Sequence, residues 1–553
     1  MLKERRGVLF GLVLSFVMLM NVSVIHAQVA PQSVDNVGIY DFIDELANGG
    51  LITVNSAIKP YSRSFIAKKL EEVYEQKNLL NLRQLKELEF YLKDFRKELP
   101  LEDDNEMSLF LWNIGSSQKG LIDTKSQRLD LFYYKDNLFS LTINPIIGGE
   151  VLKNNESVTY WKNGFEARAY IGKWAFWASL RDNHESELLG KPQYLTQRRG
   201  GHIKMGTDYS DMQGGISYAW RWGDISFRKD NFVWGNNYNG ANIFSGRAPS
   251  FMYLDLHIKP TDWFEFNYVH GWLNSMVVDS ARSYWVSNSY GDDYREKYHR
   301  KYMAANMYTF TPFKKFNVSI GNSIVYDDVA ANPAYLFPLF FYKSVDHSIT
   351  SGIDNMNSQM FFDISSRNIK NTHLYVTLFC DELSVSRFTK KDEWNFCSWK
   401  VGGKITIVPI DNLSMVIEYT YSYPLTFQHY VPTTTFQSNR YNLGHYLTDN
   451  AREWYVALGY KPFRATNILL YYLDAVRGPD YTSVGGPRVG NPPLESVEWS
   501  KKAYGLKVSG QVINDVYVWL GFEHSDIDGD QSLSPMFYYG SKNTLDLGVT
   551  VGF

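Results

Sequence analysis

The sequence predicts an all-β transmembrane barrel of about 18 antiparallel strands, preceded by a small N-terminal α-helical segment. Three features carry this prediction. The last strand alternates in character up to the C-terminal Phe553, and short turns alternate with long polar loops along residues 101–553. Aromatic residues make up 16% of the 553 residues, and membrane barrels collect such residues in girdles at both membrane interfaces.

The last strand is the most specific of these features. Its apolar residues are Leu545, Leu547, Val549, Val551 and Phe553, and they alternate with Thr544, Asp546, Gly548, Thr550 and Gly552. Successive side chains of a strand point to opposite faces, so the apolar set should face lipid and the small or polar set the lumen. Outer-membrane barrels commonly end on a terminal aromatic residue, and we expect the barrel-assembly machinery to read Phe553.

The connections between the expected strands differ strongly in length. Tight turns are expected at 172–173, 223–224, 260–262, 312–315, 409–411, 462–464 and 513–514. Long polar loops are expected at 183–213, 230–250, 273–300, 326–356, 381–396, 422–451, 475–500 and 525–542. An outer-membrane barrel has short periplasmic turns and long extracellular loops, whereas a soluble sandwich has no reason to gather every long loop at one end.

The N-terminus resembles a secretory signal peptide over residues 1–27. Lys3, Arg5 and Arg6 precede an apolar run, and Ala27 ends a candidate cleavage site. Residues 28–100 follow as an expected periplasmic helical segment, and residues 101–553 as the barrel. The first helix should stop at Gly49-Gly50, the second should run over about 64–76, and the third should open with a capping box at Asn81 and Gln84. These helices form either a packing unit with no chemistry or a lid on the barrel.

Several segments resemble, in order, the capsule-assembly Wzi family of outer-membrane proteins in the form typical of the Bacteroidetes. They are YDFIDELANGGLI (40–52), IKPYSR (58–63), KDNFVWGNNYNGANIFSGRAPSF (229–251), HGWLNS (270–275), DNMNSQMFFDIS (354–365) and NLGHYLTDNARE (442–453). The family more often has Pro or Gly after the Trp-Gly pair, so Asn236-Asn237 is a departure.

The resemblance implies a monomeric barrel of the bacterial outer membrane that binds or anchors capsular or other surface polysaccharide as a lectin. Its expected partners are that polysaccharide, outer-membrane lipid and lipopolysaccharide. The family also has relatives associated with gliding motility, so a component of a motility or secretion complex remains an alternative. A plugged pore is another.

Other classes of function find little support in the sequence. No metalloprotease, P-loop, nucleophile-elbow or cysteine metal motif is present, so we expect neither an enzyme nor a metal or other cofactor. The net charge of −3 gives no reason to expect a nucleic-acid partner.

Two loops combine aromatic rings with amide side chains, the mixture that binds sugar rings and hydroxyl groups. The candidate glycan-binding residues are Trp234, Asn236, Asn237, Tyr238, Asn242, His429, Tyr430, Asn439, Arg440, Tyr441, Asn442 and His445. The 230–250 loop could equally fold into the lumen as a plug, and a plug can still line a pocket.

A basic run and a cysteine pair complete the candidates. Arg295, Lys297, His299 and Arg300 could contact either an anionic glycan or lipopolysaccharide phosphate. Cys380 and Cys397 flank one expected loop, and they could form a disulfide in an oxidising compartment. Two separate thiols in the barrel wall are the alternative.

Overall fold

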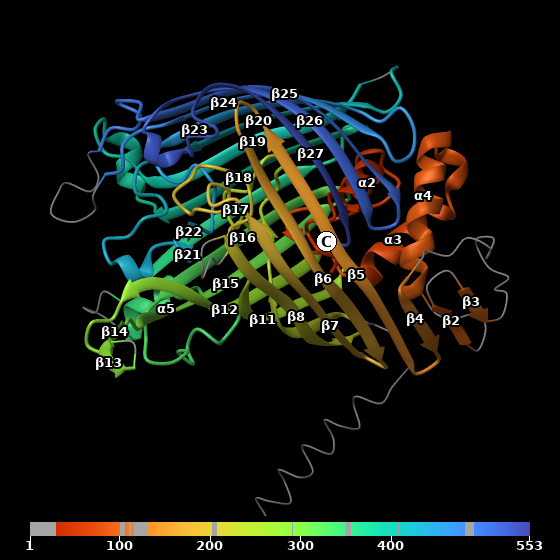
Figure 1. The fold of residues 1–553 in the computed structure, drawn as a ribbon, viewed down its shortest axis with the longest axis horizontal. Helices are drawn as coiled ribbons and strands as arrows, with labels where there is room; N and C mark the ends of the chain where they lie inside the picture. Colours follow the sequence, from red (N-terminus) through yellow and green to blue (C-terminus); the bar gives the residue numbers. More distant parts are fainter. Residues whose placement is uncertain are drawn as a thin grey trace, which may run out of the picture.

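The computed structural model in Figure 1 describes residues 29–99, 105–109, 112–115, 130–201, 207–289, 291–349, 355–407, 409–481 and 491–553. The expected signal peptide, residues 1–27, lies outside these ranges. No helix in the described part of the chain is long and apolar enough to cross a membrane.

The described strands close into an antiparallel barrel of eighteen, as the sequence predicts. They are β5 (Phe139–Lys153), β6 (Ser157–Ile171), β7 (Trp174–Glu185), β8 (Asp208–Trp220), β9 (Gly223–Asp230), β11 (Phe251–Thr261), β12 (Phe264–Val278), β15 (Tyr298–Phe313), β16 (Phe316–Tyr326), β17 (Met356–Ser366), β18 (Thr372–Glu382), β19 (Phe396–Thr406), β20 (Leu413–Ser422), β23 (Ala451–Tyr460), β24 (Asn467–Arg477), β25 (Trp499–Ile513), β26 (Val516–Gly529) and β27 (Gly540–Val551). The last strand pairs with β5, with Leu547 opposite Val151, and this pairing closes the ring. A short strand β4 (Phe132–Asp136) pairs with the start of β5 and with β2 (Asn105–Leu109), which also pairs with β3 (Trp112–Gly115).

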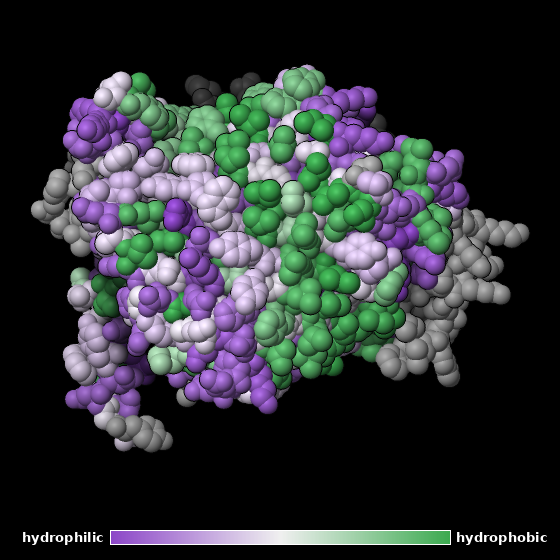
Figure 2. Space-filling model, turned by 90° about the horizontal axis from the view of Figure 1, so that it is seen from above, coloured by the Kyte–Doolittle hydropathy of each residue, from purple (hydrophilic) through white to green (hydrophobic). Residues whose placement is uncertain are grey.

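The wall alternates between an apolar outer face and a mixed inner face. On β27, Leu545, Leu547 and Val549 are exposed on the outside, whereas Gly548 and Thr550 are buried inside, as the sequence pattern predicts. The outer apolar residues of neighbouring strands form one surface, which appears as the green area over β24–β27 in Figure 2. Such a band lets the barrel lie in the hydrocarbon of a membrane.

The N-terminal helices lie at one end of the barrel, and we call this the helical end (Figure 1). They are α2 (Val37–Asn48), α3 (Arg63–Tyr74) and α4 (Leu82–Phe95), with the short 3₁₀ turns η1 (Lys77–Leu79) and η2 (Arg96–Glu98). They bury one shared apolar cluster, and α4 begins with the expected capping box of Asn81 and Gln84. Tight turns of the barrel meet them there: Asn412 accepts hydrogen bonds from Asn81 and Arg83.

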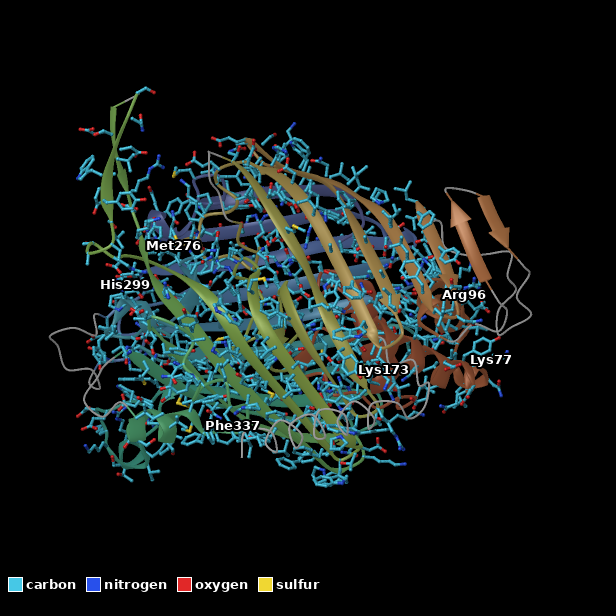
Figure 3. All side chains as sticks on the ribbon, turned by 90° about the horizontal axis from the view of Figure 1, so that it is seen from below. Lys77, Arg96, Lys173, Met276, His299 and Phe337 are labelled. Atoms are coloured by element: carbon cyan, nitrogen blue, oxygen red, sulfur yellow. A yellow bond between two sulfur atoms is a disulfide. The ribbon has the colours of Figure 1, made fainter. Side chains whose placement is uncertain are left out.

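The opposite end of the barrel, the loop end, carries most of the long connections (Figures 1 and 3). Its short elements are the hairpin β13 (Tyr284–Asn288) and β14 (Gly291–Arg295), α5 (Tyr342–Ile349), η4 (Val385–Thr389), η5 (Pro432–Thr434), η6 (Gln531–Leu533), and the hairpin β21 (Gln437–Ser438) and β22 (Tyr441–Asn442). The loop that contains α5 covers the outer face of β15 and β16, where Asn306 Nδ2 donates to the carbonyls of Pro338 and Phe340 at 2.8 and 2.9 Å.

Two long loops turn inward and fill part of the lumen. The loop 231–250 forms β10 (Val233–Trp234), which pairs inside the barrel with β1 (Ile58–Lys59) of the N-terminal segment. Phe232, Trp234 and Phe244 of this loop, with Phe427 and Phe436 of the 423–450 loop, pack on inward side chains of the wall. We call these two loops the plug. The apolar core of the molecule therefore lies inside the barrel, on one side of the lumen.

Candidate functional site

The candidate residues of the 230–250 loop make the contacts expected of a plug. Trp234 is 2% exposed, and its ring lies 6.1 Å from that of Phe361 on the inner wall. The backbone N–H and side-chain amide of Asn236 donate to Asp363 at 2.8 and 2.6 Å. The side chain of Asn242 accepts a hydrogen bond from Thr377 at 2.6 Å. These three side chains hold the loop against β17 and β18.

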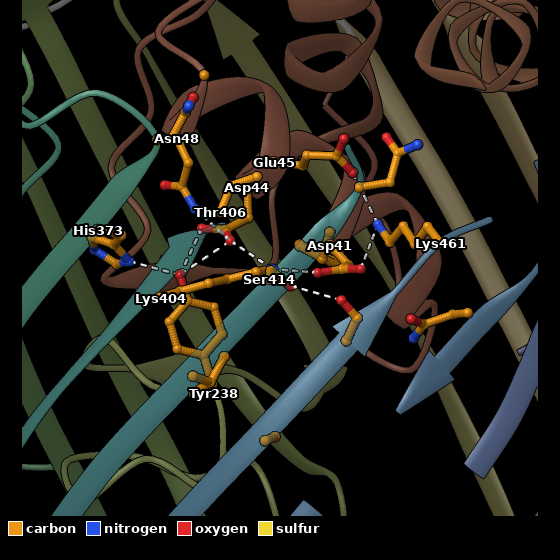
Figure 4. Close-up of a pocket in the computed structure, with 18 of the residues that line it drawn as sticks. Asp41, Asp44, Glu45, Asn48, Tyr238, His373, Lys404, Thr406, Ser414 and Lys461 are labelled. Carbon is orange, nitrogen blue, oxygen red and sulfur yellow. Dashed lines mark hydrogen bonds and ion pairs between the residues drawn. The ribbon is translucent and has the colours of Figure 1, made fainter. Parts of the chain in front are cut away.

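Asn237 and Tyr238 of the same loop line a cavity of about 530 Å³ between the plug and helix α2. The hydroxyl of Tyr238 lies 3.0 Å from Asp44 Oδ2 and 2.8 Å from Nδ1 of His373 (Figure 4). The loop is therefore both a plug and the wall of a pocket, as the sequence allowed.

Carboxylates of helix α2 and cations of the barrel face each other across this cavity, which we call the charged cavity (Figure 4). Nζ of Lys404, on β19, lies 2.7 Å from Asp41 and 3.2 Å from Asp44. Nζ of Lys461, just after β23, lies 2.7 Å from Asp41 and 3.1 Å from Glu45. The three acidic side chains fall on one face of the helix because Asp41 stands three residues before Asp44 and four before Glu45.

These ion pairs keep the three carboxyl groups of helix α2 deprotonated. Burial alone would raise the pKa of Asp41, but Lys404 and Lys461 outweigh it and hold that pKa well below its usual range. The same balance lowers the pKa of Asp44, through Lys404 and Arg367. Burial also opposes the shift at Glu45, where Lys461 and Arg83 lower the pKa to about 2. The helix is therefore bound to the wall as a trianion at neutral pH.

The candidates of the 422–451 loop divide into buried and exposed members. Tyr441 donates a hydrogen bond to the carbonyl of Gly190, and the side chain of Asn442 donates to the carbonyl of His445 at 2.8 Å. The side chains of Tyr441, Asn442 and His445 are all buried. His445 itself lies 3.7 Å from Glu453. Their contacts hold the plug together.

Of the other members of this loop, Arg440 is exposed, His429 and Tyr430 are half-buried, and Asn439 is buried. Asn439 and Arg440 form a turn with positive φ at both residues, 53° and 65°, which directs the exposed Arg440 outward. The backbone N–H of Asn439 donates to the carbonyl of Asn274 at 3.0 Å, and Asn274 pairs with Arg300 across the sheet. His429 and Tyr430 stand together elsewhere in the loop, with ring centroids 4.2 Å apart. The fold thus brings Arg440 next to the basic run, which sequence separation alone did not show.

The basic run continues the hairpin β13–β14, which projects beyond the loop end of the barrel (Figures 1 and 3). Arg295 pairs with Asp293 at 2.9 Å, and His299 with Asp327 at 3.2 Å. Nζ of Lys297 lies over the ring of Tyr284, 5.6 Å from its centroid. Arg300 is exposed and forms no ion pair with another described residue.

Two aromatic residues of this hairpin were not among the candidates predicted from the sequence. Trp285 and Tyr294 lie directly opposite each other, and their exposed fractions are 69% and 39%. Their ring centroids are 5.1 Å apart. We call Trp285, Tyr294, Lys297, Arg300 and Arg440 the outer rim. The pattern YWVSNSYGDDYR contains the signal for a short hairpin, with aromatic residues on both arms and a glycine near the turn.

Cys380 and Cys397 are joined by a disulfide in the structure. They are direct partners in the register of β18 and β19, with Cα atoms 4.1 Å apart. The bond closes the base of the 381–396 loop at the loop end. In the described part of the chain, no three or more His, Cys, Asp and Glu side chains are grouped so as to hold a metal ion.

A solved structure of an outer-membrane barrel shares this fold. The structure of Wzi from Escherichia coli, described as an outer-membrane protein involved in group 1 capsule assembly and a carbohydrate-binding β-barrel, matches with a TM-score of 0.57. The identity is 11%, and the match covers 95% of this chain and 100% of that one. OccK8 (OprE) of Pseudomonas aeruginosa matches at a TM-score of 0.41 and 9% identity, over 74% of this chain and 97% of that one. OccAB2 of Acinetobacter baumannii matches at 0.40 and 7%, over the same shares.

No protein-family model and no curated protein sequence matches the chain. The structural likeness to Wzi therefore concerns the fold. A closed barrel of this size with an apolar outer surface belongs to the bacterial outer membrane, and that is the location of this protein.

Proposed function

We propose that this protein is a non-enzymatic lectin of the outer membrane that binds a capsular or related surface polysaccharide through the outer rim. In this arrangement α2–α4 face the periplasm and the loop end faces the cell exterior, as for short turns and long loops in outer-membrane barrels. The protein acts as a monomer, with the polysaccharide as its partner.

The observation that carries the proposal is the outer rim itself. Trp285 is 69% exposed, and its ring centroid lies 5.1 Å from that of Tyr294. Arg300 and Arg440 add cations on the same end of the barrel. Exposed aromatic faces pack on the C–H groups of sugar rings, and guanidinium groups bind uronate or phosphate in pairs of hydrogen bonds. The capsule-related role named for Wzi supports the choice of ligand.

The plug favours this role over free passage of solute. A conducting pore needs an open lumen, whereas the described loops of this barrel pack an aromatic core inside it. A motility or secretion role would instead predict protein partners in fixed ratio, which co-purification from membranes would detect.

Retention on polysaccharide tests the proposal. Purified protein in detergent is run through gels containing the surface polysaccharide of the producing cells, and we expect its migration to be retarded. The triple variant Trp285→Ala, Tyr294→Ala, Arg300→Ala should lose at least about tenfold in affinity, which is about 1.4 kcal/mol. Phe388→Ala is the matched control, because Phe388 is 72% exposed in a different loop. If the wild-type protein migrates unretarded, or if the triple variant binds as well as the control, the proposal is wrong.

A further inference from the structure

The two halves of the lumen differ in how they are filled. Against β11–β18 the plug packs an apolar core that includes Phe244, Met303 and Phe361. Against β23–β27 the plug buries only a smaller apolar cluster, which includes Tyr446, Leu473 and Trp499, and the other inward side chains include tyrosines and paired charges. They remain accessible to water: Lys507 points into the lumen and yet is 40% exposed. One side of the lumen is thus filled by the larger apolar core, and the other has a hydrated wall beside the smaller cluster.

A second cavity of about 490 Å³ lies along this hydrated wall, beneath the 186–201 and 530–539 loops. We call it the tyrosine cavity. Tyr455 and Leu469 line both the tyrosine cavity and the charged cavity, so the two spaces are neighbours inside the lumen. Each has a volume within the roughly 300–1,000 Å³ that is typical of sites for small organic ligands.

The walls of the tyrosine cavity carry aromatic faces. Tyr455 and Tyr471 stand on adjacent strands with ring centroids 6.4 Å apart and planes 30° from parallel. Tyr446 of the plug and Tyr538 of the 530–539 loop line the same space. Two aromatic rings spaced along a wall, tilted by 30° to each other, offer consecutive packing positions for the C–H faces of neighbouring sugar rings.

Each charged side chain that lines the cavity has a partner of opposite charge. Arg198 lies 2.5 Å from Glu150. Nζ of Lys501 lies 2.9 Å from Glu523, and Nζ of Lys507 lies 3.6 Å from Asp546. Thr544 also lines the cavity, and its buried Oγ1 has no hydrogen-bond partner among the described residues. Paired ammonium and carboxylate groups offer donors and acceptors to hydroxyl groups without attracting a net charge. This chemistry fits a neutral sugar better than an acidic one.

We propose that the tyrosine cavity binds a short segment of neutral oligosaccharide inside the barrel, at a site separate from the outer rim. The choice of a sugar as the ligand rests on the proposed function. The location of the site and the neutral character of the ligand rest on the residues that line the cavity. A glycan would then meet the protein at two places, one on the projecting hairpin and one within the lumen.

Calorimetric titration of the purified full-length protein tests this site. The probes are maltotriose, cellotriose, mannotriose and tri-N-acetylchitotriose, with trigalacturonate as the acidic comparison. We expect at least one neutral trisaccharide to bind saturably and trigalacturonate to bind at least about tenfold more weakly. If none of the four neutral probes binds, the inference is wrong.

Two variants locate the binding. Gly521→Trp fills the cavity, because Gly521 lines it and an added Cβ would lie 3.4 Å from Asp546 Cβ. Leu520→Trp is its matched control, since Leu520 is 54% exposed on the outer face of the same strand. We expect the first to weaken trisaccharide binding at least about tenfold and the second to leave it unchanged. If the glycine variant fails to form a barrel, Tyr471→Leu takes its place, because Tyr471 lines the tyrosine cavity and not the charged cavity, and we expect the same loss of trisaccharide binding.

The rim variants separate this inference from the proposed function. We expect Trp285→Ala to weaken retention on polysaccharide and to leave trisaccharide binding intact. If the cavity variants bind trisaccharide like the wild type, the inference fails while the proposed function stands. If polysaccharide retention is absent but a cavity variant abolishes trisaccharide binding, the proposed function fails and the luminal site stands.

Discussion

The carboxylate of Asp44, on helix α2, accepts a hydrogen bond of 2.7 Å from Nη2 of Arg367, which directly follows barrel strand β17. Nε of the same guanidinium donates to Asn48, also at 2.7 Å. Asp44 and Asn48 are four residues apart and so lie one above the other on the helix. One arginine therefore holds a full turn of α2 against the barrel, and it does so almost without exposure to solvent.

Removing this arginine should release the helix. Arg367→Met leaves the Asp44 carboxylate and the side-chain amide oxygen of Asn48 facing an apolar side chain. Loss of one partner from a buried pair costs about 3–5 kcal/mol. Because Lys404 still lies 3.2 Å from Asp44, we expect a smaller loss of about 2–3 kcal/mol in the free energy of unfolding. Urea unfolding followed by tryptophan fluorescence measures it.

The control for that measurement is an exposed pair. Lys69 and Glu72 on α3 lie 2.7 Å apart, with Glu72 42% exposed. Lys69→Met should cost no more than about 0.5 kcal/mol. Equal losses in the free energy of unfolding of the two variants would show that Arg367 stabilises the protein no more than a surface charge does.

Acid should undock α2 within a defined range of pH. The carboxylates of Asp41, Asp44 and Glu45 have lowered pKa values in the folded protein, from ordinary values of 3.8 for Asp and 4.5 for Glu. Their contribution to stability is therefore present in full above about pH 4.5 and decreases below it. The share of Glu45 is lost as the pH falls through about 2, the pKa of that residue, and the shares of Asp41 and Asp44 are lost at still lower pH. Proteolysis of residues 29–99 by an acid-active protease, measured against pH, follows this release. Release that begins near neutral pH would contradict the assignment.

The disulfide should stabilise one loop rather than the whole barrel. Cys380 and Cys397 are separated by 17 residues, a closure worth about 3 kcal/mol in the chain-entropy account. The same residues are already neighbours in the sheet, so we expect the double variant Cys380→Ser, Cys397→Ser to lose only about 1–3 kcal/mol and to keep its barrel. Trypsin should then cut more readily at the exposed Lys390. Free thiols in the unreduced wild-type protein would rule the bond out.

The sequence predicted those parts of the fold that depend on local pattern. The alternation from Leu545 to Phe553 defined the outer face of the last strand, and the spacing of Asn81 and Gln84 defined the start of α4. In both cases the signal lies within a few residues, and burial on one face enforces it.

The candidate site was harder to predict because contact in a barrel joins distant residues. The hydrogen bond between Asn439 and Asn274 brings Arg440 close to Arg300, and no local sequence pattern predicts that the two arginines lie close together. Tyr455 and Tyr471 follow an ordinary strand pattern, and only the three-dimensional fold shows that they line a cavity beside the plug. The sequence also left open whether Asn237 and Tyr238 belonged to a plug or a pocket, and they belong to both.

Loosening the plug should turn the closed barrel into a conducting one. Trp234 is 2% exposed, and its ring meets that of Phe244 edge-on at 5.4 Å. Trp234→Ala removes the largest side chain of this contact, at a cost of about 3–5 kcal/mol for a core aromatic residue. That energy holds the loop 231–250 in place, so its loss should favour conformations with an open lumen. In planar lipid bilayers we expect rare or no openings for the wild type and frequent openings for the variant. Trp285→Ala is the matched control, since Trp285 lies outside the lumen and should leave conductance at the wild-type level. Steady conductance of the wild-type protein would instead mean that the plug does not seal the barrel.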